Sequence, residues 1–169
     1  MSLDTGPPTG HEKNYTLARK ESTMRIEHLT PQLIGSFDAA CDMAHKNGHE
    51  TIGTEDWLLA FLYDPSYSLR MSLDEHQRVA NFVGDKYPNY GAFEKYKELR
   101  QSDELFGAVN QAIFQRPGGA GKRVTRDDVL WVLLGNENTA VCALRAAGVD
   151  VQTLRVSLLA GIKSGVGRE

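Results

Sequence analysis

The sequence contains no apolar run close to the roughly 20 residues that a membrane-spanning helix needs, and its start lacks the apolar core of a secretory signal. It also lacks the alternation of apolar and polar residues that marks strands, and the turn motifs that join them. Only two cysteines occur, Cys41 and Cys142, each among small and apolar residues typical of a helix interior. We therefore expect an all-α protein of a reducing, cytoplasmic compartment that makes no use of a membrane.

An excess of charge of one sign is absent too, because 19 Lys and Arg stand against 22 Asp and Glu, for a net charge of -3. This balance supplies no basic field for phosphate backbones and argues against nucleic acid as a partner. The 169 residues, 41% of them hydrophobic, suffice for one compact unit or two small equivalent lobes. Residues 1–25 have little apolar content and predict a flexible leader.

The chain contains an internal repeat with an offset of 72 residues (102 minus 30). More than thirty residues align without a gap at this offset. The matched pairs are Thr30 and Ser102, Leu33 and Leu105, Phe37 and Val109, Ala40 and Ala112, Ile52 and Val124, Glu55 and Asp127, Leu58 and Leu130, and Leu62 and Leu134. The sequence thus predicts two tandem copies of one fold, related by a pseudo-twofold axis.

Each copy shows helical spacing of its apolar residues. The first helices carry stripes from Leu29 to Ala44 and from Leu105 to Ile113, and glycine-containing turns at Gly48 and 117–119 end them. Second helices are expected to begin where the hydroxyls of Thr54 and Thr125 accept bonds from free backbone N–H groups. Apolar residues occupy nearly every face of these second helices, which indicates burial at the centre of each lobe.

Copy two continues with a helix from Thr139 to Ala147, stopped at Gly148, and a last helix capped by Asp150. We expect two lobes of four to five helices each. The boundaries are repeat one at about 29–84, a linker at about 85–98 and repeat two at about 99–160, together a domain over 26–162, followed by a flexible tail over 163–169.

The segment Gly48 to Leu62 resembles the signature of the N-terminal repeat of the Clp family of protein-unfolding ATPases, G-H-x-x-I-G-T-E-H-L-L-L-x-L-L. Thr139 to Asp150 is similar to a second family segment, a helix followed by G-V-D. The chain departs from the signature at Asp56 and Trp57, and copy two lacks G-T-E. In the family this double repeat normally precedes ATPase modules, so we expect either a free-standing repeat protein or a fragment.

The resemblance implies a non-catalytic module without a cofactor that binds proteins. The implied partners are a Clp ATPase, a Clp protease subunit, an adaptor or an unfolded client. In some relatives the helix starts bind phosphorylated arginine, and the corresponding pairs here are Thr30 with Glu55 and Ser102 with Asp127. The alternative, which we favour, is that these four residues are helix caps and first-turn acids.

Two other candidate sites fail on their residues. The glycine-rich stretch 118–123 resembles a P-loop, but position 116 is Arg116, the hydroxyl after the lysine is replaced by Arg123, and no buried strand precedes it. His45 and His49 have a metal-ligand spacing, but Gly48 intervenes and no third ligand follows. No catalytic constellation is recognisable either, so the sequence predicts neither ATP binding, a metal site nor catalysis.

Four aromatics between the copies form the best candidate for partner binding, namely Tyr87, Tyr90, Phe93 and Tyr96. The alternative interpretation, of equal weight, is that this segment packs between the lobes and joins them. The leading hypothesis is a docking module for a Clp-type unfoldase or protease. The alternatives are a receptor for a small molecule or a modified peptide in the groove between the lobes, and an enzyme built on the repeat scaffold.

Overall fold

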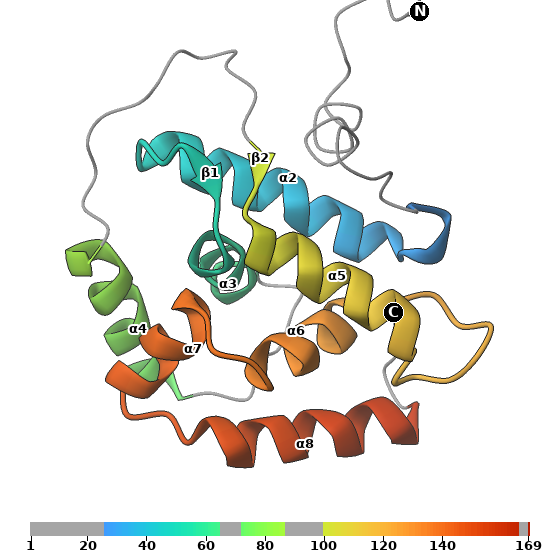
Figure 1. Ribbon diagram of the computed structural model, residues 1–169. Helices are drawn as coiled ribbons and strands as arrows, with labels where there is room; N and C mark the ends of the chain where they lie inside the picture. The colour runs from blue at the N-terminus through green and yellow to red at the C-terminus, as the bar shows by residue number, and fades with distance from the viewer. Residues whose placement is uncertain (1–25, 65–71, 87–99, 166–168) are drawn as a thin grey trace, which may run out of the picture.

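The computed structural model describes residues 26–64, 72–86, 100–165 and 169 (Figure 1). In chain order the elements are η1 (Ile26–His28), α2 (Pro31–Lys46), β1 (Thr51–Ile52), α3 (Thr54–Leu62), α4 (Leu73–Lys86), β2 (Arg100–Gln101), α5 (Asp103–Gln115), α6 (Arg126–Leu134), α7 (Thr139–Ala146) and α8 (Val151–Ser164). The all-α class is confirmed. The two strands were not predicted, because a strand of two residues is too short to show alternation.

The first helix of each copy begins at a hydroxyl cap. The Oγ atoms of Thr30 and Ser102 each accept a bond of 3.2 Å, from the backbone N–H of Leu33 and Leu105. Helix α2 ends as predicted, with Gly48 in the left-handed region at φ 73°. Helix α5 ends differently, because Arg116 takes the left-handed conformation at φ 50°.

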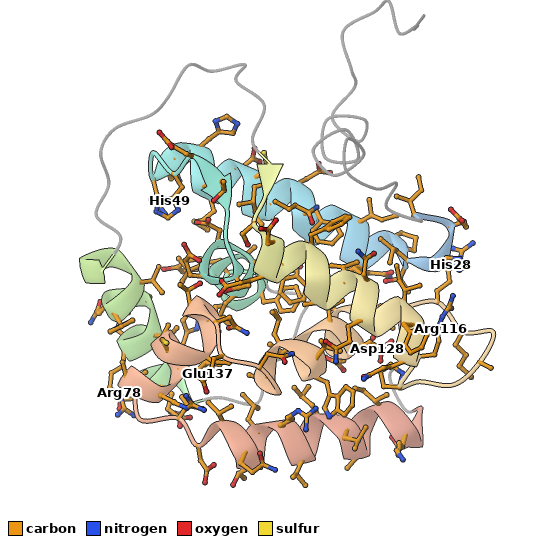
Figure 2. The ribbon with its side chains drawn as sticks, in the orientation of Figure 1. His28, His49, Arg78, Arg116, Asp128 and Glu137 are labelled. Carbon is orange, nitrogen blue, oxygen red and sulfur yellow. The ribbon has the colours of Figure 1, made fainter. Side chains whose placement is uncertain are left out.

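The side chain of Arg116 forms hydrogen bonds to nearby backbone carbonyls in that conformation. Its Nε donates to the carbonyl of Ile113 over 2.8 Å and its guanidinium donates to the carbonyl of Lys122 over 2.6 Å. The guanidinium also lies 2.7 Å from Nδ1 of His28, which places both residues at the same end of the molecule (Figure 2). The loop between α5 and α6 is thereby attached to the start of copy one.

The second helices confirm one predicted cap and correct the other. Thr125 caps α6, but the N-cap of α3 is Gly53, and Thr54 is already helical. In both helices the aspartate at the third helical position bonds back to the cap residue: Asp56 accepts the N–H of Gly53 and Asp128 that of Thr125, both over 2.9 Å. The Thr54 hydroxyl is free of the capping role and accepts the N–H of Ala140 on α7 instead.

The two copies exchange contacts across a pseudo-twofold arrangement. Strands β1 and β2 pair in parallel with Ile52 opposite Gln101, and an isolated parallel bridge joins Leu29 to Val124. Gln101 and Leu29 are equivalent in the repeat, and so are Val124 and Ile52, since both pairs differ by 72. The start of each first helix therefore lies against the start of the second helix of the other copy.

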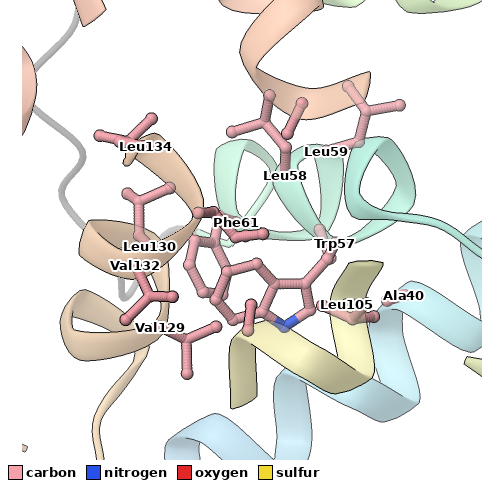
Figure 3. Packing of buried hydrophobic residues seen from close by; sticks show 14 of the residues in the cluster. Ala40, Trp57, Leu58, Leu59, Phe61, Leu105, Val129, Leu130, Val132 and Leu134 are labelled. Atoms are coloured by element: carbon pink, nitrogen blue, oxygen red, sulfur yellow. The ribbon is translucent and has the colours of Figure 1, made fainter. Parts of the chain in front are cut away.

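One buried cluster runs through both copies (Figure 3). At its centre Trp57 and Phe61 of α3 have ring centroids 3.9 Å apart, and the indole Nε1 of Trp57 donates to Ser36 over 2.9 Å. The apolar residues of α3 from Trp57 to Phe61 are buried as predicted, and the polar first turn from Thr54 to Asp56 is buried as well, which was not predicted. Because the copies share this core, the described residues offer nothing that favours a receptor groove between two separate lobes.

The cysteines and the C-terminal segment correct smaller expectations. Cys41 is buried as predicted, but Cys142 is exposed, because it lies on the outer face of α7. Helix α8 continues to Ser164, and Glu169 contacts the body of the protein although a flexible tail was expected from residue 163. The expected leader, residues 1–25, lies outside the described residues, as does most of the expected linker. None of the described helices has the length and apolarity to cross a membrane.

Candidate functional site

Two equivalent sites form where helix starts of different copies meet. The first, here called the cationic site, joins the start of α2 to the start of α6 through Thr30 N–H and the carbonyl of Val124, 3.0 Å apart. The second, the acidic site, joins α5 to α3 through Ser102 N–H and the carbonyl of Ile52, 2.9 Å apart. The sequence analysis paired helix starts within each copy. The structure instead brings Thr30 to the helix that carries Asp127, and Ser102 to the helix that carries Glu55.

The cationic site holds a carboxylate on a buried arginine. Arg126 is 4% exposed, and its Nε donates to Oε2 of Glu169 over 2.6 Å. The other oxygen of Glu169, Oε1, accepts the hydroxyl of Thr30 over 2.8 Å and the backbone N–H of Arg126 over 3.3 Å. The Arg126 guanidinium also donates to Asp64 over 2.7 Å. Arg126 thus connects α6 to Asp64, which lies just after α3, and to Glu169, which lies beyond the end of α8.

An open pocket of about 340 Å³ lies over this site, lined by Thr30, Pro31, Lys122, Arg123 and Glu169. Lys122 and Arg123 are exposed on the loop before α6. Their positive charges and the positive N-terminal ends of α2 and α6 all act on the same small region. These positive groups surround the carboxylate of Glu169, which lines the same pocket.

The acidic site surrounds the start of α3. Asp56 is fully buried, and Nδ1 of His49 lies 2.9 Å and 3.1 Å from its two carboxylate oxygens, at the end of α2 (Figure 2). Glu55 is 7% exposed and accepts the hydroxyl of Thr139 over 2.7 Å. Burial, and next the negative charge of Asp56, raise the pKa of Glu55 above its ordinary value.

A chain of hydroxyls links the acidic site to α7. Because the single hydroxyl hydrogen of Thr139 goes to Glu55, the 2.6 Å contact between Thr54 and Thr139 has Thr54 as its donor. The Thr54 oxygen then accepts the N–H of Ala140 over 3.0 Å. The raised pKa of Glu55 therefore accompanies a structural junction between the copies, and no nucleophile and base pair is assembled there.

Three possible metal donors also meet at the acidic site. Ligand atoms of His49, Glu55 and Asp56 lie within 4.8 Å of one another. Asp56 is already bound to Gly53 N–H and to His49, and Glu55 is bound to Thr139. The three side chains fix the start of α3, and a metal would have to displace these bonds.

The structure gives each sequence-based candidate a place except the aromatic group. Thr30 and Ser102 are helix N-caps, and Glu55 and Asp127 lie in the first turns of α3 and α6. Tyr87, Tyr90, Phe93 and Tyr96 lie outside the described residues.

The sequence analysis missed Arg126, Asp64 and Glu169. One signal for Arg126 was present, because it replaces Thr54 of copy one at a repeat position whose neighbours are buried. Asp64 and Glu169 gave no local signal, since each lies more than forty residues from Arg126 in the chain.

Comparisons with known proteins connect this arrangement to solved structures. No protein-family model matches the sequence, and no curated protein does. The N-terminal domain of the caseinolytic protease associated chaperone ClpD from Arabidopsis thaliana superposes with a TM-score of 0.65 and 16% identity, over 82% of this chain and 99% of that domain. A structure from investigations of a malarial protein secretion system gives a TM-score of 0.66 and 14% identity, over 84% of this chain and 99% of the other. At these identities the likeness concerns the fold.

Proposed function

Starting from the fold of a Clp N-terminal domain, we propose that this chain is a non-catalytic recognition module that docks substrates or adaptors for a Clp-type ATP-dependent unfoldase or protease. One observation supports it above the others. The fold matches 99% of the N-terminal domain of a chaperone associated with caseinolytic protease, and the segment Gly48 to Leu62 carries a similar signature. We place the module in a reducing, cytoplasmic compartment, in keeping with two cysteines that form no disulfide, Cys41 and Cys142.

The roles of the conspicuous polar groups agree with a binding function. Asp56 and Asp128 cap helices, and Glu55 joins α3 to α7. The exposed charges of Lys122 and Arg123, on the loop before α6, line an open pocket. An open charged pocket of this kind suits contact with a partner.

The proposed partners are a Clp ATPase, a Clp protease subunit, an adaptor or an unfolded client. We propose the aromatic residues Tyr87, Tyr90, Phe93 and Tyr96 as one docking segment, because aromatic side chains bury much surface at modest entropic cost. Among the helix-start candidates Thr30 is proposed as a second contact, because it lines the pocket of the cationic site.

The test is capture of partners from a lysate of the host by the immobilised full chain. The variant Tyr90→Ala with Phe93→Ala removes two proposed anchors. The control variant is Tyr63→Ala, which removes an aromatic that is 57% exposed at the end of α3. Quantitative mass spectrometry is expected to find Clp ATPase or protease subunits, or a set of unfolded clients, on the wild-type chain and on the control, and less of them on the double variant.

The result that contradicts the proposal is equally specific. If the wild-type chain enriches no component of an unfolding or degradation system over empty beads, the docking function is wrong. If it enriches them equally with all three proteins, the function stands and the aromatic segment is not the docking site.

A further inference from the structure

We propose that the cationic site is a recognition site for the side-chain carboxylate of an acidic peptide segment, and that Glu169 occupies it as an intramolecular ligand. The inference deepens the docking function and rests on it, because it names the chemistry that one partner segment must present. It concerns the buried Arg126, the α2 cap Thr30 and the pocket above them.

The site is built to hold one carboxylate group through both of its oxygens. Donors converge from two helix starts, namely the Thr30 hydroxyl at 2.8 Å and the Arg126 N–H at 3.3 Å from Oε1, and the Arg126 Nε at 2.6 Å from Oε2. Arg126 is 4% exposed, so its bonds act in an environment that water screens poorly. Charge-assisted bonds of this kind are about twice as strong as neutral ones.

Copy one has no charged residue at the repeat position of Arg126. The equivalent residue of copy one is Thr54, which carries no charge and still begins a buried helix of the same length. The arginine in copy two therefore adds an anion-binding group to a helix start that forms without one. The exposed Lys122 and Arg123 beside it add two more positive charges around the pocket.

The site also keeps a partner for Arg126 when Glu169 leaves. Asp64 lies 2.7 Å from the same guanidinium and comes from the end of α3, far from Glu169 in the chain. Arg126 is thus held in place and compensated by Asp64 while its Nε and backbone N–H become available. An open pocket of about 340 Å³ then leads to these donors from solvent.

A ligand on the same chain competes with any ligand from outside. Ligands that belong to the same chain as their site have effective concentrations on the order of millimolar, so an outside carboxylate binds the intact chain only when it exceeds this level or brings further contacts. Removing the Glu169 carboxylate is expected to strengthen binding of an acidic peptide by about tenfold or more.

The probe is a fluorescein-labelled peptide with the sequence of residues 164–169, Ser-Gly-Val-Gly-Arg-Glu, amidated at its end so that only the side chain of its glutamate is acidic. Fluorescence anisotropy measures its binding to the full wild-type chain and to Glu169→Gln. The control peptide carries Gln in place of Glu. A third protein, Glu169→Gln with Lys122→Gln and Arg123→Gln, adds changes at two exposed residues to Glu169→Gln and leaves Arg126 in place.

We expect saturable binding of the Glu peptide to Glu169→Gln, at least about tenfold tighter than to wild type, with the Gln peptide and the triple variant both weaker. Thermal melts of Glu169→Gln should rise with added Glu peptide. If Glu169→Gln melts lower than wild type but binds neither peptide, or binds both equally, Glu169 is only a structural ion-pair partner and the inference is wrong. Capture of Clp components by the wild-type chain would then still support the docking function, so the two failures are distinguishable.

Discussion

The pair of His49 and Asp56 gives the sharpest stability prediction. Asp56 has no exposed surface and its partner imidazole is 12% exposed, with Nδ1 2.9 Å and 3.1 Å from the two carboxylate oxygens. His49→Ala removes that partner and leaves a buried carboxylate that still accepts the N–H of Gly53. Asp56 occupies the position at which the Clp repeat signature has its second histidine, so this difference from the signature supplies the carboxylate of the pair.

The magnitude follows from the cost of an uncompensated buried charge. Removing one member of a buried ion pair destabilises a protein by about 3–5 kcal/mol. The Gly53 bond and the positive start of α3 continue to stabilise the Asp56 carboxylate, so we expect the lower end, about 3 kcal/mol. For a chain of this size that lowers the melting temperature by roughly 6–12 °C.

Urea unfolding followed by fluorescence measures this loss, because Trp57 is fully buried one residue after Asp56. The control His45→Ala removes a histidine of the last turn of α2 and should cost less than about 1 kcal/mol. Asp56→Asn keeps an acceptor for Gly53 and removes the charge, so adding it to His49→Ala should restore part of the loss. If His49→Ala costs no more than His45→Ala, or if the two substitutions are additive, the buried-pair reasoning is wrong.

Three further predictions follow from the same contacts. Burial raises the pKa of Glu55, so its ionisation disfavours the folded state and wild-type stability falls as pH rises from about 4.5 through the folded pKa. The variant Glu55→Gln should therefore melt higher than wild type near pH 8 and equally below about pH 4.5. A variant that melts lower at every pH would contradict this. The hydrogen bond from the Thr153 N–H lowers the pKa of Asp150, so the contribution of Asp150 to stability is present above about pH 3.8 and is lost as pH falls through the folded pKa. The difference in melting temperature between wild type and Asp150→Ala should vanish in acid, and a constant difference would refute the capping role of Asp150. A thiol reagent should modify Cys142 at once and Cys41 only on unfolding, whereas two equally fast thiols would show that α2 is not packed as described.

Much of the fold was predictable because its signals are local. The apolar stripes and the caps at Thr30, Ser102 and Asp150 depend on residues a few positions apart, and the offset of 72 is found by aligning two copies of these local patterns. The buried centre of α3 was predictable for the same reason. The start of α3 was wrong by one position, because Gly53 is the N-cap residue and the Thr54 hydroxyl bonds to α7 across the copies.

The missed features depend on contacts between distant residues. The pairing of Leu29 with Val124 and of Ile52 with Gln101 crosses from one copy to the other, and repeat equivalence alone fits pairing within copies equally well. The bond between Arg126 and Glu169 spans 43 residues and uses single charges without a motif. Neither contact has a pattern that a sequence can display.

The central claim is tested most directly by replacing the N-terminal domain of the host's Clp-type unfoldase with this chain and measuring ATP-dependent degradation of the proteins that the chain captures. A short unstructured client that needs no N-terminal domain serves as the positive control for the motor. The account predicts that the chimaera degrades captured proteins faster than the unfoldase without any N-terminal domain, and that Tyr90→Ala with Phe93→Ala reduces this gain. Equal degradation by the chimaera and the truncated unfoldase, with the control client degraded normally, would contradict it.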